Sequence, residues 1–292
     1  MVEKRGASMR TVYVNGVFCP EDEGKVSIFD RGFLFADAVY EVVSVLDGKL
    51  VDFAGHMARL ARSLGELAMA APTSDDELLA IHRRLIAENA LEEGAVYLQV
   101  TRGPADRDFL FPPQDTKPSL VLFTQAAALR DKPAARTGIR VVTLPDLRWQ
   151  RRDIKTVQLL YPSMAKTEAK RRGADDAWMV EDGCVTEGSS NNAYIVDAGG
   201  KLVTRPLSHA ILPGITRIAV LRLAAESGIA IKERPFTVDE ALAAKEAFIS
   251  SASSFVMPVV EIDGQPIADG RPGEITRRLR AIYIEEALKT AI

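Results

Sequence analysis

The chain has 292 residues, which is long enough for two domains of ordinary size with a large hydrophobic core. Hydrophobic residues make up 47% of the sequence and charged residues 26%, as is usual for a globular protein. The net charge is only −3, and the basic residues are scattered along the chain, so we expect no nucleic-acid partner.

Neither a membrane span nor a secretory leader is expected. No apolar run approaches the roughly 18 residues of a transmembrane helix, and residues 1–5 lack the apolar segment of a signal peptide. The two cysteines, Cys19 and Cys184, are too few for a disulfide scaffold. No CxxC or HxxxH pair indicates a metal site. We therefore expect a cytoplasmic protein without a bound metal.

The first part of the chain, residues 1–125, predicts a small domain of mainly antiparallel strands with helices on one face. The dipeptides Asn15-Gly16 and Asp47-Gly48 lie between short apolar runs, which is typical of β-hairpin turns. The hairpin strands are expected at residues 11–14, 17–19, 39–46 and 49–53. Two more strands are expected at residues 95–101 and 119–124. One helix is expected around Leu60, and a second from the capping box at Ser74 to about Asn89.

Residues 126–138 are rich in Ala, Arg and Lys and show no clear period, so we interpret them as an interdomain connection. The remaining residues, 139–292, predict a larger second domain in which strands and helices alternate. The helices are expected at residues 159–172, 216–227, after the capping box at 237–240, and from about 274. The strands are expected at residues 139–144, 193–196, 202–204, 229–234 and 247–250, with a hairpin through 182–183.

Lys155 and Glu187 are the first candidates for chemistry. Lys155 lies between apolar segments at an expected helix start, where a cation is unfavourable against the helix dipole and therefore suggests a functional reason. A partly desolvated lysine has the lowered pKa that Schiff-base formation and proton transfer require. Glu187 lies in a polar stretch expected to form a turn, where its carboxylate could hold a protonated ring nitrogen. By pattern alone, a surface lysine and a turn-capping carboxylate are equally open interpretations.

Four segments together resemble the fold-type IV pyridoxal phosphate enzymes, and among these most of all the D-amino acid aminotransferases. They are residues 153–169, 186–192, 214–217 and 259–264, and the similarity extends from about Tyr13 to Tyr283. The resemblance implies a two-domain α/β fold, with a small α/β domain and a larger domain whose core is like a β-barrel. It also implies a homodimer and pyridoxal 5′-phosphate as the cofactor, with Lys155 as the Schiff-base lysine and Glu187 at the ring nitrogen. Lys166, on an expected solvated helix face, is the competitor of Lys155.

The resemblance further implies where the cofactor would be held. The residues that match the cofactor contacts of the family are Arg59, Lys155, Glu187, Ser189, Ser190, Ile215, Thr216, Ala252 and Ser253. The start of the helix expected at Thr216 is a natural anion site, because its first N–H groups have no partner within the helix. The small residues 188–190 are expected to offer free N–H groups beside the ring. Without the resemblance, an arginine on a helix such as Arg59 would be interpreted as a solvent-exposed charge.

Substrate recognition departs from the pattern of the D-amino acid aminotransferases, which hold the substrate carboxylate with a tyrosine, an arginine and a histidine. Tyr40 matches the tyrosine and Arg107 matches the arginine, which in the family acts from the partner subunit. The position of the histidine holds Phe109, which makes the site more apolar. Because a bidentate arginine contact is strong, we keep carboxylate recognition in the prediction. An ion pair between Arg107 and Asp108 is the alternative interpretation.

The reaction implied by the resemblance is a ping-pong transamination from a D-amino acid to a 2-oxo acid such as 2-oxoglutarate or pyruvate. Three other enzymes of this fold stay open: a branched-chain L-amino acid aminotransferase, an (R)-amine transaminase and an aminodeoxychorismate lyase. The first is disfavoured because Leu160 stands where those enzymes have a tyrosine, five residues after the lysine. No GxSxG or GxGxxG motif points to a serine hydrolase or a nicotinamide enzyme. A non-enzymatic binding protein is disfavoured by the presence of both Lys155 and Glu187.

Overall fold

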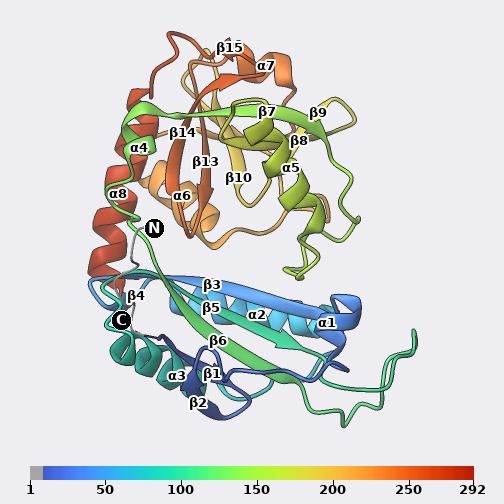
Figure 1. Cartoon of the computed structure of the whole chain (residues 1–292). Helices are drawn as coiled ribbons and strands as arrows, with labels where there is room; N and C mark the ends of the chain where they lie inside the picture. The colour runs from blue at the N-terminus through green and yellow to red at the C-terminus, as the bar shows by residue number, and fades with distance from the viewer. Residues whose placement is uncertain (1–8) are drawn as a thin grey trace, which may run out of the picture. The chain divides into compact units, whose positions relative to one another are not determined.

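The computed structural model describes residues 9–292, which divide into two units (Figure 1). The N-terminal unit holds residues 9–127 together with Lys155–Val157 and Ala291–Ile292, and the C-terminal unit holds Ala128–Ile154 and Gln158–Thr290. Each unit combines a β-sheet with helices, so the expected mixed α/β fold is confirmed. None of the helices in the described part is long and apolar enough to cross a membrane. The chain start, where the sequence predicts no signal peptide, lies outside the described residues.

The N-terminal unit is built on a six-stranded sheet in the order β2-β1-β6-β5-β3-β4. Its strands are β1 Thr11–Val14, β2 Val17–Pro20, β3 Ala38–Leu46, β4 Lys49–Leu50, β5 Glu93–Thr101 and β6 Ser119–Ala126. Both expected hairpins are confirmed, and both residues of each turn have positive φ: 48° and 97° at Asn15 and Gly16, and 50° and 70° at Asp47 and Gly48. Such left-handed turns match the twist of the paired strands. Strand β4 is shorter than expected, because helix α2 already begins at Phe53.

Three helices belong to this unit: α1 Arg31–Phe35, α2 Phe53–Glu66 and α3 Asp75–Glu88. Helix α2 packs against β3 and helix α3 against β1, β5 and β6, and Figure 1 shows α2 behind the long strands of the sheet and α3 beside β1. Helix α3 starts as its sequence predicts, because the Ser74 hydroxyl accepts the N–H of Glu77. The buried side of α2 includes Met57, Leu60 and Leu64.

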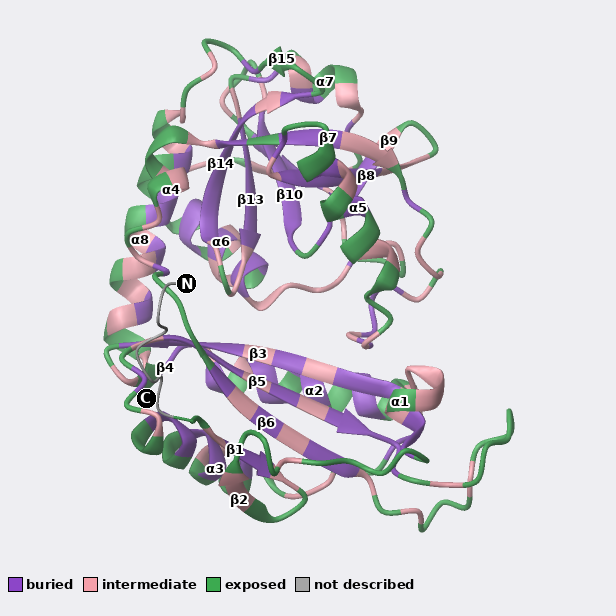
Figure 2. Ribbon diagram, in the orientation of Figure 1, coloured by how far each residue is buried: buried purple, intermediate pink, exposed green. Residues whose placement is uncertain are grey.

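The C-terminal unit is built on a nine-stranded curled sheet in the order β12-β11-β10-β13-β14-β7-β8-β9, with β15 beside β14. Its strands are β7 Ile139–Pro145, β8 Asp176–Glu181, β9 Cys184–Gly188, β10 Asn192–Val196, β11 Leu202–Thr204, β12 Ile231–Glu233, β13 Glu246–Ser251, β14 Phe255–Ile262 and β15 Gln265–Pro266. Strand β14 was not expected from the sequence, although it lies between β13 and β7 near the middle of the sheet. Figure 2 shows that β10, β13 and β14 are almost wholly buried, as a central strand requires.

Five helices surround this sheet: α4 Pro133–Thr137, α5 Leu160–Arg171, α6 Ile215–Glu226, α7 Val238–Leu242 and α8 Glu274–Thr290. The short helix α4 lies inside the segment that the sequence left without a period. Helix α7 has the expected capping box, in which Thr237 and Glu240 each cap the backbone N–H of the other. The first residues after α5 and α6 include Gly173 and Gly228 with φ near 75–78°, so both helices end at the predicted glycines.

Candidate functional site

Lys155 lies in the N-terminal unit, in an extended segment that pairs with the start of strand β3. Its carbonyl accepts the N–H of Tyr40 at 3.0 Å, and Val157 donates to the carbonyl of Ala38 at 3.1 Å. Helix α5 begins at Leu160, within one residue of the expected start at 159, but Lys155 lies five positions before it, so the expectation that Lys155 lies at a helix start is wrong. The backbone here is extended because it adds hydrogen bonds to β3. The helix dipole therefore does not act on this lysine.

The side chain of Lys155 is half-buried against an aromatic face. Its Nζ lies 4.1 Å from the centroid of the Tyr40 ring. Tyr40 stacks on Tyr97, and Tyr97 on Phe123, with ring centroids 5.6 and 4.7 Å apart. These rings come from β3, β5 and β6 and form a ladder across one face of the sheet. The ladder fixes the Tyr40 ring next to the Lys155 amine, whereas the competitor Lys166 is exposed on α5.

Arg59 lies on the buried side of helix α2, one turn before Ser63. Its Nε and Nη2 donate to the two carboxylate oxygens of Glu41 at 2.8 and 2.7 Å, and Nδ1 of His56 is 2.7 Å from the same carboxylate. Burial alone would raise the pKa of Glu41, but the charge and hydrogen bonds of Arg59, together with His56, lower it to about 2. The ionised carboxylate therefore holds one edge of the guanidinium. Ser63 accepts the N–H of Lys155 at 3.4 Å, so α2 brings Arg59 and Lys155 to the same part of the unit.

Glu187 lies in the C-terminal unit at the end of strand β9, not in a turn, because the strand continues through Gly188. Its side chain is buried and accepts three hydrogen bonds: from Arg148 at 2.5 Å, Asn192 at 3.0 Å and the N–H of Leu212 at 3.1 Å. Burial raises the pKa of Glu187, and the charge of Arg148 offsets only part of this effect. The carboxylate is therefore more easily ionised when another positive group approaches it.

Arg148 joins Glu187 to a second buried carboxylate. Its Nε and Nη2 donate to the two oxygens of Asp146, and its Nη1 donates to Glu187. Asp146 also accepts the hydroxyl of Thr186 at 2.6 Å and lies 3.6 Å from Nε of Arg152. Because Arg148 makes bidentate and single contacts at once, it fixes the orientation of Glu187. Neither Arg148 nor Asp146 was identified from the sequence.

Asn192 connects Glu187 to the start of helix α6. Its amide donates to Glu187 and to the carbonyl of Leu212, each at 3.0 Å. Gly214 is the N-cap of α6, and a Cβ added there would lie 2.1 Å from the amide oxygen of Asn192, so this position needs glycine. Since Gly214 offers no side chain to the helix start, the N–H groups of Ile215 and Thr216 are not capped by it. Helix α6 thus begins one residue earlier than predicted, and Leu212 and Asn192 link the segment before it to Glu187.

The serine-rich turn after strand β13 lies close to the same residues, because Asn192 pairs with Ser250 in the sheet. The hydroxyls of Ser250 and Tyr194 are 2.8 Å apart, and the N–H of Ser254 donates to Ser251. Ala252 and Ser253 form the tip of the turn, where Ser253 is exposed and its carbonyl accepts the amine of Lys132 at 2.6 Å. The C-terminal unit thus links the segment around Glu187, through Asn192, to the serine-rich turn, whereas Arg59 and Lys155 lie in the N-terminal unit.

Ser189 and Ser190 behave differently from each other. The N–H groups of Gly188 and Ser189 donate to the carbonyls of Asn191 and Ala177, so the expectation of free N–H groups at these two residues is wrong. The first bond is local to the end of β9, and the second joins Ser189 to the neighbouring strand β8. The Ser189 hydroxyl donates to the buried carboxylate of Asp176, and Ser190 is exposed.

Arg107 and Phe109 lie on the loop that joins β5 to β6 in the N-terminal unit. Both are exposed, and the Arg107 guanidinium lies 5.4 Å from the ring of Phe35 and 5.5 Å from that of Phe109. Arg107 forms no salt bridge with any residue in the described part of the chain. The alternative of an Arg107–Asp108 ion pair is therefore not realised, and Asp108 accepts the N–H of Leu110 at 3.0 Å instead.

Both the family model and the relatives that match this chain are aminotransferases. The family model described as amino-transferase class IV matches residues 38–262. The chain is similar to the D-alanine aminotransferase of Staphylococcus aureus (strain N315), at 40% identity over 274 residues that cover 93% of this chain and 96% of that protein.

Among solved structures, the chain is similar to the branched-chain amino acid aminotransferase of Escherichia coli. The TM-score is 0.87 at 24% identity, with 96% of this chain and 95% of the other covered. The branched-chain aminotransferase of the archaeon Thermoproteus uzoniensis, solved with norvaline, has a TM-score of 0.84 at 27% identity, with 97% and 96% covered. These likenesses confirm the fold.

Proposed function

Because this chain belongs to the class IV aminotransferases, we propose that it transfers the amino group of a D-amino acid to a 2-oxo acid, with pyridoxal 5′-phosphate as its cofactor. The observation that carries the proposal is the 40% identity, over nearly the whole length of both chains, to a D-alanine aminotransferase. We assign the Schiff base to Lys155 and the ring nitrogen to Glu187, and both residues are present in the sequence. The acceptor would be a 2-oxo acid such as 2-oxoglutarate or pyruvate.

The buried carboxylate of Glu187 fits the ring nitrogen of this cofactor. A carboxylate has about four lone-pair positions. In the described part of the chain, Arg148, Asn192 and Leu212 fill three of them, and an N–H of the ring could take the fourth. Burial raises the pKa of Glu187, so a positive group at that position would stabilise its charge.

The phosphate of the cofactor fits the start of helix α6. A helix start offers N–H groups to an anion, and α6 begins without a side-chain cap at Gly214. Asn192 bonds to both Glu187 and Leu212, so the contacts proposed for the two ends of the cofactor are fixed relative to each other. We assign Ile215, Thr216, Ala252 and Ser253 to the phosphate. Arg59 is the proposed cation of the N-terminal unit.

The residues of this chain would divide the reaction among them. When bound, the cofactor supplies an electron sink for the bond that breaks at the substrate α-carbon. The Nζ of Lys155 would take the α-proton of the substrate and deliver it to the cofactor carbon that carries the amino group, while the Tyr40 ring beside it keeps the amine in place. Glu187 keeps a positive charge on the ring, which is where the electron sink needs it.

The substrate carboxylate is assigned to Tyr40 and Arg107. Arg107 is exposed and forms no salt bridge within residues 9–292, so its guanidinium fork is available to a carboxylate. Phe109 stands beside it and makes the surroundings apolar. Amino donor and acceptor would use the same contacts in turn, which predicts ping-pong kinetics.

A panel of D- and L-amino acids tests the proposal. The purified protein is incubated with each amino acid and 2-oxoglutarate or pyruvate, and the 2-oxo acid product and the new amino acid are measured. Turnover of D-alanine or a related D-amino acid, dependent on the acceptor, would support the proposal. Turnover confined to branched-chain L-amino acids would contradict it. Product formation without any acceptor would point to a lyase instead.

We also propose that the protein is a homodimer in the cytoplasm. Two joined segments of the N-terminal unit expose large apolar side chains, namely Ile28, Phe29, Phe33, Phe109, Leu110 and Phe111. Apolar groups gathered in this way are usually covered by a partner. Light scattering should therefore find a particle of two 31.8 kDa chains. A monomer at micromolar concentration would contradict the dimer. The proposed cytoplasmic location rests on Cys19 and Cys184, which form no disulfide, as is usual in a reducing compartment.

A further inference from the structure

The loop at residues 102–118 carries both residues assigned to substrate recognition, and it has no helix or strand of its own. Connections longer than about 12–15 residues without secondary structure are uncommon and usually functional. Phe109 is 80% exposed, so burial of the loop's own side chains does little to fix the loop around Phe109. The conformation of Arg107 and Phe109 must therefore be held by contacts from outside the loop.

Arg31, the first residue of helix α1, makes such contacts. Its Nη1 donates to the carbonyl of Asp108 at 2.8 Å and to that of Leu110 at 3.3 Å, so it grips the backbone on both sides of Phe109. Its Nε donates to Asp37 at 2.8 Å, and its side chain is only 3% exposed. The two carbonyls are thus tied to a buried ion pair. Such an arrangement restricts the backbone around Phe109 directly.

A set of ring contacts extends from Arg31 to Arg107. The Arg31 guanidinium lies 4.4 Å from the ring centroid of Phe35, which meets the Phe109 ring edge-on at 5.7 Å. Arg107 in turn lies over both of these rings. The conformation of the proposed carboxylate-binding arginine is therefore coupled to Arg31 through Phe35 and through the loop backbone.

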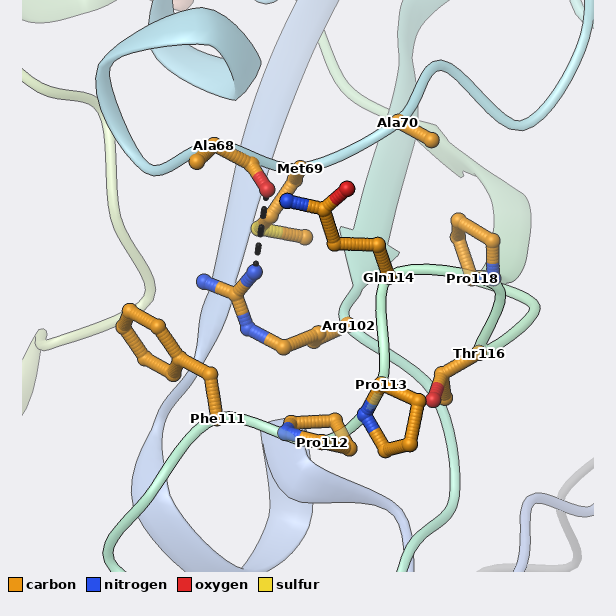
Figure 3. A pocket seen from close by; sticks show the side chains of 10 residues that line it. All are labelled: Ala68, Met69, Ala70, Arg102, Phe111, Pro112, Pro113, Gln114, Thr116 and Pro118. Carbon is orange, nitrogen blue, oxygen red and sulfur yellow. Dashed lines mark hydrogen bonds between the residues drawn. The ribbon is translucent and has the colours of Figure 1, made fainter.

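Arg102 provides a matched comparison. It also donates to Asp37, at 2.7 Å, but its other N–H groups bond the carbonyls of Leu67 and Ala68 at the end of α2. Figure 3 shows the Arg102 guanidinium between Ala68 and Phe111, whose ring centroid is 3.9 Å away. Arg102, the first residue of the loop, thus belongs to the same ion-pair cluster as Arg31, but its hydrogen bonds hold the start of the loop and not the carbonyls beside Phe109.

We propose that Arg31 is a positioning residue that sets the affinity of the enzyme for the substrate carboxylate by holding the loop around Arg107 and Phe109. This inference rests on the function proposed above. If Arg31 releases the two carbonyls, Arg107 spends less time in its binding conformation, and apparent affinity falls by that fraction. The chemical step is untouched, so KM should rise while kcat stays the same.

The test compares Arg31→Lys with Arg102→Lys. Each lysine keeps a positive charge beside Asp37, but a single ammonium cannot span Asp37 and the carbonyls of Asp108 and Leu110. We expect Arg31→Lys to raise KM for D-alanine by roughly three- to tenfold, because it loses one or two hydrogen bonds. Both kcat of Arg31→Lys and KM of Arg102→Lys should stay within about twofold of wild type.

A double-mutant cycle with Arg107→Ala shows whether Arg31 acts through Arg107. In the Arg107→Ala background, Arg31→Lys should change KM by less than about twofold. An unchanged KM in Arg31→Lys, or an equal rise with and without Arg107, would overturn the inference. If Arg107→Ala itself leaves KM unchanged, the proposed carboxylate contact is wrong, and the inference is overturned with it.

A second readout does not depend on activity. Trypsin cleavage of the Arg107–Asp108 bond, followed by mass spectrometry, reports the local order of the loop when every variant is folded by near-UV circular dichroism and has the same oligomeric state by light scattering. Cleavage should be faster in Arg31→Lys than in wild type or Arg102→Lys. Equal cleavage of all three proteins would overturn the inference even if the KM values differed.

Discussion

The Nζ of Lys155 lies 4.1 Å from the centroid of the Tyr40 ring, so the proposed proton carrier and one proposed substrate contact touch each other. Tyr40 is itself fixed by stacking on Tyr97. One tyrosine therefore has two separable parts: a ring that holds the lysine amine and a hydroxyl assigned to the substrate carboxylate. A cation over an aromatic face contributes about 0.5–2 kcal/mol, depending on its exposure.

Two substitutions at Tyr40 should separate these parts. Tyr40→Phe keeps the ring under Lys155 and should raise KM for D-alanine severalfold with little change in kcat, because only the hydroxyl is lost. Tyr40→Leu removes the ring as well and should lower kcat in addition. Steady-state kinetics of both variants checks this. A wild-type KM in Tyr40→Phe would show that the hydroxyl does not bind the carboxylate.

Glu187→Gln should abolish most turnover while the cofactor stays bound. Glutamine keeps the shape of the side chain but cannot balance a full positive charge on the ring, and losses of roughly a hundredfold or more are typical when such a group is removed. The measurements are kcat and the near-visible absorbance of the cofactor. Glu181→Gln is the matched control, because Glu181 bonds Arg152 at the far end of the same network. Wild-type rates in Glu187→Gln would contradict the assignment.

Arg107→Ala should weaken D-amino acids much more than simple amines. An arginine–carboxylate contact is commonly worth about 1.5–3 kcal/mol, so kcat/KM for D-alanine should fall by roughly tenfold or more. A carboxylate-free amine such as 1-phenylethylamine should be affected much less. Phe109→His, which restores the histidine of the D-amino acid aminotransferases, should favour D-alanine over bulky amines. Equal losses for acids and amines in Arg107→Ala would show a structural role.

His82 should make the stability of the fold sensitive to acid. It is fully buried, its Nδ1 lies 2.7 Å from the carbonyl of Leu78, and Nε2 finds no partner among residues 9–292. Burial lowers the pKa of His82 to about 4, from 6.5. The unfolded chain therefore takes up this proton first as the pH falls. The contribution of neutral His82 to the free energy of unfolding should be fully present above pH 6.5 and should be lost as the pH falls through about 4.

The variant His82→Leu isolates this effect. Between pH 7 and pH 4.5 the wild type should lose roughly 2–3 kcal/mol more of its free energy of unfolding than the variant does. Urea unfolding at the two pH values measures the difference. His209→Gln is the control, because His209 is exposed. This variant should lose as much free energy of unfolding between the two pH values as the wild type does. If His82→Leu loses as much, His82 is not the acid-sensitive group.

The parts of the fold that could be predicted are those with local causes. Asn15-Gly16 and Asp47-Gly48 specify their turns by backbone preference, and the capping residues at Ser74 and Thr237 specify helix starts. Strand β14 was missed because it is buried on both faces and contains Pro258, so it shows no alternation. The start of helix α5 was predicted to within one residue, whereas the pairing of Lys155 with β3 is non-local and could not be predicted.

The candidate site shows the same division. Motif matching pointed to Glu187, but the pairing of Glu187 with Arg148, 39 positions away, depends on how β7 and β9 are brought together. Likewise, nothing near Arg59 in sequence identifies Glu41 as its partner, because strand β3 and helix α2 must first pack. Residues that position a functional side chain, such as Arg148 and Glu41, therefore cannot be identified from the sequence when their contacts are non-local.

The most direct test of the central claim is to reduce the purified protein with borohydride and to map the cofactor by peptide mass spectrometry. The account predicts a yellow protein whose reduced cofactor is attached to Lys155 and remains so in Lys166→Ala. Lys155→Ala should lose the label and nearly all turnover. A label on Lys166, or an unchanged rate in Lys155→Ala, would contradict the assignment on which the proposed mechanism depends.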